Sequence, residues 1–139
     1  MQASFILFRL LLLYHHPSLS LRLDSNNLPP ELYLTPWLLT FFARTLDMQT
    51  TLALWDQYLL ENDPLLHHFL LLAFLRQHLP LLLSCPHDVL PETISNLSFS
   101  GLIEVKSLIF EAKLIKKDTP ESYCRRLYRV CLTDLNPSS

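Results

Sequence analysis

The 139-residue chain contains a single glycine, Gly101, although glycine usually makes up about 7 % of a protein. Tight β-turns, phosphate-binding loops and dinucleotide-binding folds need glycine at several positions, because glycine adopts left-handed backbone conformations at little cost. Leucine, a strong helix former, is the dominant residue instead. The composition therefore favours an all-α fold.

Apolar residues recur at helical spacing along the whole chain, and no alternating strand pattern competes with them. We expect about six to eight helices, whose limits follow from proline and capping residues. The predicted segments are a first helix over residues 3–14, a loop over 23–31, a helix that begins at Pro36, a helix capped by Asp47, a core helix from Asp63 and Pro64 to about His78, one or two short helices within 80–100, an amphipathic helix from Leu102 and a last helix from Thr119 and Pro120.

The chain's only two tryptophans, Trp37 and Trp55, lie in two of these predicted helices. Trp37 comes one helical turn before Phe41, a spacing that lets the two rings stack. Trp55 belongs to a stripe of apolar residues that recur as on one face of a helix, namely Met48, Leu52, Trp55 and Leu59. We interpret the aromatic residues of both helices as core packing rather than a ligand pocket: Trp37, Phe41, Phe42 and Trp55.

Two apolar runs resemble targeting or membrane segments. The first, residues 5–14, contains Arg9 and has neither a basic flank nor a small-residue cleavage site, so a buried helix is the better interpretation. The second, residues 64–83, has about the length of a bilayer span, but histidines, Arg76 and Pro80 interrupt it. We interpret it as the central core helix, with a small helical membrane protein as an alternative.

Little in the sequence points to catalysis, a metal or nucleic acid. The net charge of −2 is too small for a nucleic-acid interface, although residues 104–139 carry seven basic and five acidic side chains, net +2. The adjacent pairs His15–His16 and His67–His68 lack the spacing of helical metal sites. The three cysteines show no close pair, which indicates a reduced, cytoplasmic compartment. We therefore expect no catalytic residue, no cofactor and no metal site.

Two short motifs in order resemble the later part of the TBC domain, the all-helical fold of Rab GTPase-activating proteins. The family has an aromatic-led helix of the type WFhThFA, matched by residues 37–43, followed by a helix that contains hWD. The similarity is closest to one branch, the Golgi-associated TBC–rhodanese proteins of the TBC domain family member 23 type, over residues 10–33, 52–75 and 108–128. The resemblance implies structural roles for Trp37, Phe41, Phe42, Leu54, Trp55 and Asp56.

Active TBC domains supply an arginine from an IxxDxxR motif and a glutamine from a YxQ motif to the nucleotide of the Rab. The arginine stabilises the charge that develops on the transferred phosphoryl group. Neither motif occurs in this sequence, and no tyrosine is followed two residues later by glutamine. Both motifs belong to the family's earlier half. The resemblance therefore implies a partial TBC domain, the C-terminal helical half, over residues 1–135, with a disordered tail over 136–139.

The TBC–rhodanese branch itself lacks both catalytic groups and links vesicles to Golgi coiled-coil proteins. The resemblance thus implies a catalytically silent protein-interaction module, not an enzyme, that captures or tethers endosome-derived vesicles at the trans-Golgi network. Its expected partners are golgin-type coiled coils or Rab GTPases, without nucleic acid and with at most peripheral membrane association. The alternative is a fragment of an active Rab GTPase-activating protein.

The amino-acid composition agrees with a partial domain. The chain is 50 % hydrophobic and 17 % charged, compared with roughly 25 % charged residues in an average globular chain. Half of a helical domain would leave one side of its helices uncovered. We therefore expect exposed apolar surface that promotes association.

Overall fold

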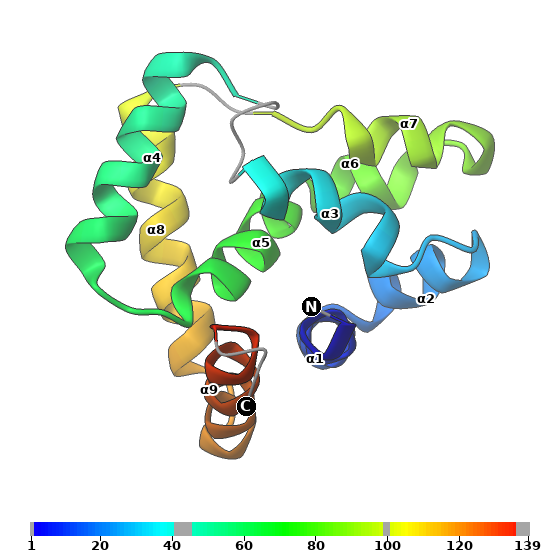
Figure 1. The fold of residues 1–139 in the computed structure, drawn as a ribbon. Helices are drawn as coiled ribbons and strands as arrows, with labels where there is room; N and C mark the ends of the chain where they lie inside the picture. The colour runs from blue at the N-terminus through cyan, green and yellow to red at the C-terminus, as the bar shows by residue number, and fades with distance from the viewer. Residues whose placement is uncertain (1, 41–45, 99–100, 136–139) are drawn as a thin grey trace.

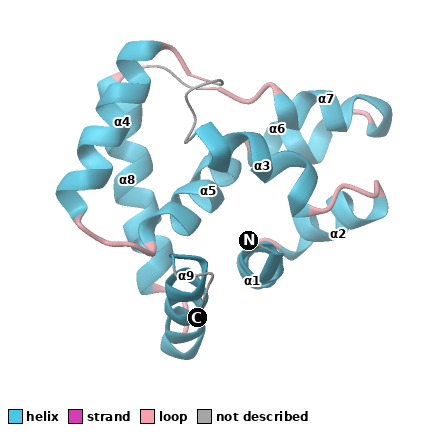
Figure 2. Ribbon diagram, viewed as in Figure 1, coloured by secondary structure: helices cyan, strands magenta, loops and turns pink. Residues whose placement is uncertain are grey.

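The computed structural model describes residues 2–40, 46–98 and 101–135. Within these ranges the chain is built from helices and turns, with no strand (Figure 1, Figure 2). The elements are α1 (Gln2–His15), α2 (Pro17–Ser25), α3 (Pro30–Thr40), α4 (Met48–Glu61), α5 (Leu66–Gln77), α6 (Leu79–Ser84), the 3-10 helix η1 (His87–Val89), α7 (Leu90–Ser95), α8 (Leu102–Lys117) and α9 (Glu121–Leu135). The predicted all-α fold is confirmed, with nine α-helices in the described ranges rather than six to eight.

Helix α5 lies at the centre of the hydrophobic core, as predicted. Leu66 and every residue from His68 to Leu75 are buried. Helix α8 packs along α5 and also against α4, while α1 contacts α5 and extends the core toward α2 and α3 (Figure 1). A helix that is apolar on nearly all sides needs partners on all sides. The central position of α5 therefore follows directly from its sequence.

The two apolar runs of the sequence form helices of the core. Helix α1 buries Phe5, Phe8, Leu11 and Leu12, which confirms the interpretation of the N-terminal run as a buried helix. The second run forms α5 and α6. Among the described residues, no helix combines the length and the apolar character that crossing a membrane requires.

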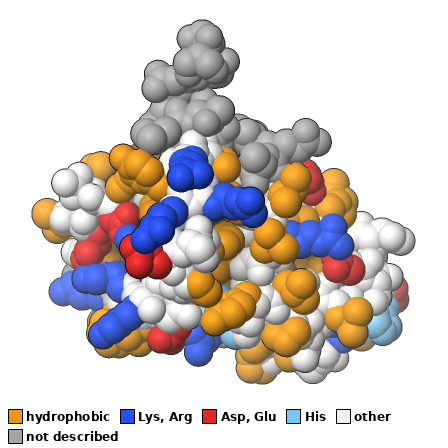
Figure 3. All heavy atoms as spheres, turned by 90° about the horizontal axis from the view of Figure 1, so that it is seen from below, with side chains coloured by type: hydrophobic (Ala, Val, Ile, Leu, Met, Phe, Trp, Pro, Cys, Tyr) orange, Lys and Arg blue, Asp and Glu red, His pale blue; other side chains and the backbone are white. Residues whose placement is uncertain are grey.

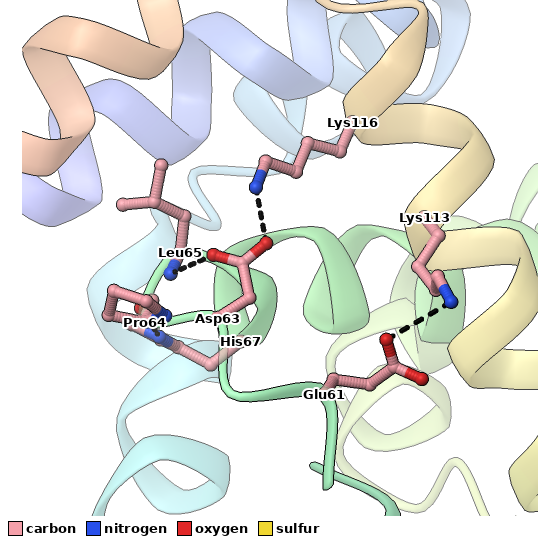
Figure 4. Close-up of polar contacts among 7 residues, drawn as sticks. All are labelled: Glu61, Asp63, Pro64, Leu65, His67, Lys113 and Lys116. Carbon is pink, nitrogen blue, oxygen red and sulfur yellow. Dashed lines mark hydrogen bonds and ion pairs between the residues drawn. The ribbon is translucent and has the colours of Figure 1, made fainter. Parts of the chain in front are cut away.

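Asp47 caps a helix where the sequence predicts it, whereas α5 begins at Leu66, two residues after the predicted start at Pro64, and Asp63 does not cap it because Leu65 is the residue at the N-cap. The Asp47 carboxylate accepts hydrogen bonds from the Thr50 backbone N–H at 3.1 Å and from its hydroxyl at 2.6 Å, and it caps α4. Asp63 Oδ1 accepts from the Leu65 backbone N–H at 3.0 Å just before α5 (Figure 4). Gly101 precedes α8 with a φ of 99°, so the chain's only glycine stands where other residues are strained.

The segment between α1 and α4 is more helical than predicted. The helix expected to begin at Pro36 begins at Pro30, so the assignment of Pro36 as its first residue is wrong. Pro30 has the same advantage at a helix start, because the first residue needs no amide donor. Helix α2 was not predicted, and it extends into the expected loop because Leu19 and Leu23, one helical turn apart, are both buried.

The apolar stripe predicted as the core face of α4 lies on its exposed side. Met48, Leu52 and Leu59 are 78 %, 50 % and 72 % exposed, and Trp55 is 36 % exposed. The helix instead buries Thr51 and Leu54 where it packs against α8. Both sets of residues repeat at helical spacing, so periodicity alone could not decide which side is buried. The expectation that Trp55 is a core residue is therefore wrong.

Exposed apolar side chains gather on three helices, as the composition predicts. They include Ile6, Leu10, Leu13 and Tyr14 of α1, the stripe of α4, and Ile103, Phe110 and Leu114 of α8. The exposed apolar surface is thus confirmed. Its cause, a missing half of the domain, stays a prediction.

Candidate functional site

The residues of the two family motifs occupy different environments. Trp37 is 1 % exposed and meets Phe74 of α5 edge to face, with ring centroids 5.1 Å apart. Leu54 is fully buried on α4, whereas the adjacent Trp55 and Asp56 lie at the surface. The predicted site residues Phe41 and Phe42 lie outside the described residues. The described motif residues therefore do not converge on one site, and their structural roles in the family stay a prediction.

A groove between α1 and α9 combines apolar and charged walls. Its volume is about 590 Å³. We call it the α1–α9 groove. Its lining residues are Leu7, Leu10, Leu11 and Tyr14 from α1, Thr119 and Pro120 from the turn before α9, and Ser122, Tyr123, Arg125, Arg126 and Arg129 from α9. The sequence puts more than a hundred residues between its two walls.

Two hydrogen bonds fix α1 against the start of α9. The Tyr123 hydroxyl donates to the Leu7 carbonyl at 2.6 Å. The Thr119 hydroxyl donates to the Ile115 carbonyl at 2.7 Å, so its oxygen accepts the bond from His15 Nε2 at 2.9 Å. Leu7 and His15 are eight residues apart, which is roughly 12 Å along a helix. The two helices that form the groove are thus joined at two separated points.

The walls of the α1–α9 groove combine apolar surface with positive charge. Leu10 and Tyr14 are 47 % and 61 % exposed on one wall. The other wall is formed by the exposed side chains of Arg125, Arg126 and Arg129. The Arg125 guanidinium forms an ion pair with the Glu121 carboxylate of the same helix at 3.1 Å. Figure 3 shows the molecule from below the view of Figure 1, with basic and hydrophobic side chains interleaved. Such a surface suits a partner with both apolar and acidic groups.

The histidines at the end of α1 add no positive charge near neutral pH. Burial lowers the pKa of His15 below its ordinary value of 6.5, and the nearby Arg76 guanidinium lowers it further. The pKa of His16 is lowered by the same two causes in the same order. The arginines of α9 are therefore the source of the positive charge at the groove.

A second cluster of charges has a structural role. The ammonium of Lys116 on α8 pairs with Asp63, and Lys113 pairs with Glu61 at 3.0 Å (Figure 4). These pairs join α8 to the connection between α4 and α5. The lysines and carboxylates of this cluster neutralise one another, so the adjacent cavity of about 470 Å³ offers less net charge to a ligand than the α1–α9 groove.

The sequence indicated the basic wall of the α1–α9 groove but not the apolar wall opposite it. The basic excess of residues 104–139 comes partly from the arginines of α9. Nothing in the sequence showed that α1 lies opposite them, because that pairing is a tertiary contact. The apolar residues Leu10 and Tyr14 had been assigned to a buried helix without distinction between its faces.

Comparison with known proteins gives one family. Residues 1–83, from α1 into α6, match the family model of the Rab-GTPase-TBC domain. Over 56 residues the chain is 36 % identical to proteins named TBC domain-containing protein kinase-like protein from Gallus gallus, Mus musculus and Homo sapiens. The matched stretch is 40 % of this chain and 6 % of the length of each relative. The relatives' names do not point to the TBC–rhodanese branch, which stays a prediction.

Proposed function

We propose that this chain, which belongs to the Rab-GTPase-TBC domain family, is a catalytically silent protein-interaction module of vesicle trafficking. The observation that carries the proposal is the α1–α9 groove in a member of a family named for Rab GTPases. One wall of the groove lies within the matched residues 1–83, and the other lies beyond them. The module acts through binding, and the groove is its binding surface.

The proposed lack of GTPase-activating activity follows from two motifs that the sequence does not contain. Rab activation requires an arginine and a glutamine that reach the bound nucleotide, and such an arginine accelerates hydrolysis by roughly 10³–10⁵. The sequence contains neither IxxDxxR nor YxQ.

The chemistry of the α1–α9 groove favours a helical partner with an acidic, amphipathic face. Three arginines on one wall attract carboxylates, and the apolar wall from α1 accepts leucine or aromatic side chains. Golgin-type coiled coils are the helical partners that the resemblance suggests, and a Rab GTPase is the other partner that the family suggests. By its resemblance to the TBC–rhodanese branch, the module works in endosome-to-Golgi vesicle capture on the cytoplasmic side of the trans-Golgi network and of vesicles.

Calorimetric titration of the purified chain with golgin coiled-coil segments and with GTP-loaded and GDP-loaded Rab GTPases tests the proposal. Arg126→Glu reverses one charge within the groove, and Lys106→Glu makes the same change at an exposed position of α8 outside it. We expect Arg126→Glu to weaken binding by at least about tenfold, or 1.4 kcal/mol, while Lys106→Glu leaves the affinity nearly unchanged. Equal effects of both variants would show that the groove is not the binding surface.

The competing function is that of a fragment of an active Rab GTPase-activating protein. The observation in its favour is family membership itself, because the family is defined by domains that act on Rab GTPases. The two functions differ in one measurable respect. An activating fragment accelerates GTP hydrolysis by a Rab that it binds, whereas a silent module binds without acceleration.

A further inference from the structure

Three metal-binding side chains meet where the start of α5 faces the end of α9. His67 and His68 open α5, and Cys131 lies on α9, more than sixty residues later in the sequence. One ligand atom from each of the three lies within 4.8 Å of the others. The two imidazole rings are 4.1 Å apart between centroids. The spacing of the histidine pair along its own helix does not reveal this cluster, because the third side chain comes from another helix.

His68 carries a buried polar atom that the protein leaves unsatisfied. Its side chain is 2 % exposed, and its Nδ1 has no hydrogen-bond partner among the described residues. A buried polar atom without a partner costs about 1–3 kcal/mol. A metal ion bound to Nδ1 would satisfy this buried atom. A neutral imidazole is the form that binds metal ions.

His67 is oriented by a second contact. Its Nδ1 lies 3.0 Å from the carbonyl oxygen of Pro64. Because a carbonyl only accepts, Nδ1 carries the proton, and Nε2 keeps its lone pair for a ligand. Metal-binding histidines commonly have this arrangement, in which a backbone carbonyl holds the ring and fixes the tautomer.

We propose that His67, His68 and Cys131 form a zinc site that joins the end of α9 to the start of α5. Two imidazole nitrogens and one thiolate match the ligands that Zn²⁺ prefers, with a water molecule as the fourth. The Cys131 thiol loses its proton to solvent as the Zn–S bond forms. Tetrahedral zinc places such ligand atoms roughly 3.3–3.8 Å apart, so side chains whose ligand atoms already lie within 4.8 Å of one another need only a small adjustment to bind it.

Cobalt substitution and zinc titration of the full chain test the site. Co²⁺ bound to a thiolate gives a sulfur-to-metal charge-transfer band, which reports directly on a cysteine ligand. Cys131→Ser removes the proposed ligand, and Cys124→Ser makes the same change seven residues earlier on α9, outside the cluster. His67→Ala removes a second ligand at a position that is only partly buried. Circular dichroism of each variant confirms that the helices remain.

We expect one equivalent of Zn²⁺ to bind the wild-type chain and Cys124→Ser and to raise the thermal midpoint of both. Cys131→Ser should lose the charge-transfer band, and Cys131→Ser and His67→Ala should each bind zinc at least about tenfold more weakly. A band that persists in Cys131→Ser, or is lost in Cys124→Ser, would overturn the assignment of ligands. Zinc affinity equal in all four proteins would overturn the site itself.

Discussion

Replacement of each tryptophan by alanine should separate the core position from the surface position. Trp37 is 1 % exposed, and a tryptophan buries about 150–250 Å². At about 25 cal/mol per Å² this gives roughly 5 kcal/mol as an upper estimate, so we expect Trp37→Ala to cost about 4 kcal/mol, within the usual range for buried aromatic residues. Trp55 is 36 % exposed, and solvent fills the space that it leaves, so Trp55→Ala should cost only about 2 kcal/mol.

Urea denaturation followed by circular dichroism measures both changes in the free energy of unfolding. Because Trp37→Ala could unfold the chain, the milder pair Trp37→Phe and Trp55→Phe provides a second readout. Each of these variants keeps a single tryptophan, whose fluorescence reports its own environment. Trp37 alone should emit at shorter wavelength and resist quenching by iodide, whereas Trp55 alone should be quenched. Equal losses of stability, or a quenchable Trp37, would refute the assignment of core and surface.

Three further predictions, which use four substitutions, test contacts and charges that affect the stability of the fold. Tyr123→Phe removes the hydrogen bond to the Leu7 carbonyl and should lower the free energy of unfolding by about 1 kcal/mol, which urea denaturation would detect; no loss would show that this bond does not hold α9 to α1. Lys116→Ala should lower the free energy of unfolding by about 1 kcal/mol. Lys113→Ala should lower it by roughly half as much or less, because its ion pair is more exposed. The reverse order of the two losses in urea denaturation would contradict the structural role given to these ion pairs. Burial and Arg76 lower the pKa of His15 in the folded chain, so below about pH 6.5 the unfolded chain binds more protons and stability falls as the pH falls. His15→Gln should reduce the change in the urea midpoint between pH 7.5 and pH 5.5, to which the other buried histidines also contribute. An unchanged slope would refute this contribution of His15.

Elements with one unambiguous apolar pattern could be predicted from the sequence. Helix α8 is predicted as an amphipathic helix from Leu102, and it buries Val105, Leu108 and Ala112 on one side. Helix α5 was placed at the centre because its apolar residues surround it on all sides. Asp47 was recognised as a cap because its side chain has one strong local use at a helix start. In each case the deciding interaction lies within a few residues of the sequence.

The remaining features depend on contacts between distant segments. Trp55 was assigned to the core because its stripe has helical spacing, but α4 meets α8 through the side that carries Leu54. The α1–α9 groove and the cluster of His67, His68 and Cys131 each join residues far apart in the chain. A motif search along one segment cannot find such sites, because their spacing exists only after folding.

Single-turnover GTP hydrolysis by Rab GTPases that bind the chain tests the central claim most directly. The Rab is loaded with GTP, the chain is added until binding is saturated, and the rate constant is compared with that of the Rab alone. The account predicts the intrinsic rate, because the sequence supplies neither the arginine nor the glutamine of an active TBC domain. An acceleration approaching the roughly 10³–10⁵ of a catalytic arginine would contradict it and identify the chain as part of a Rab activator.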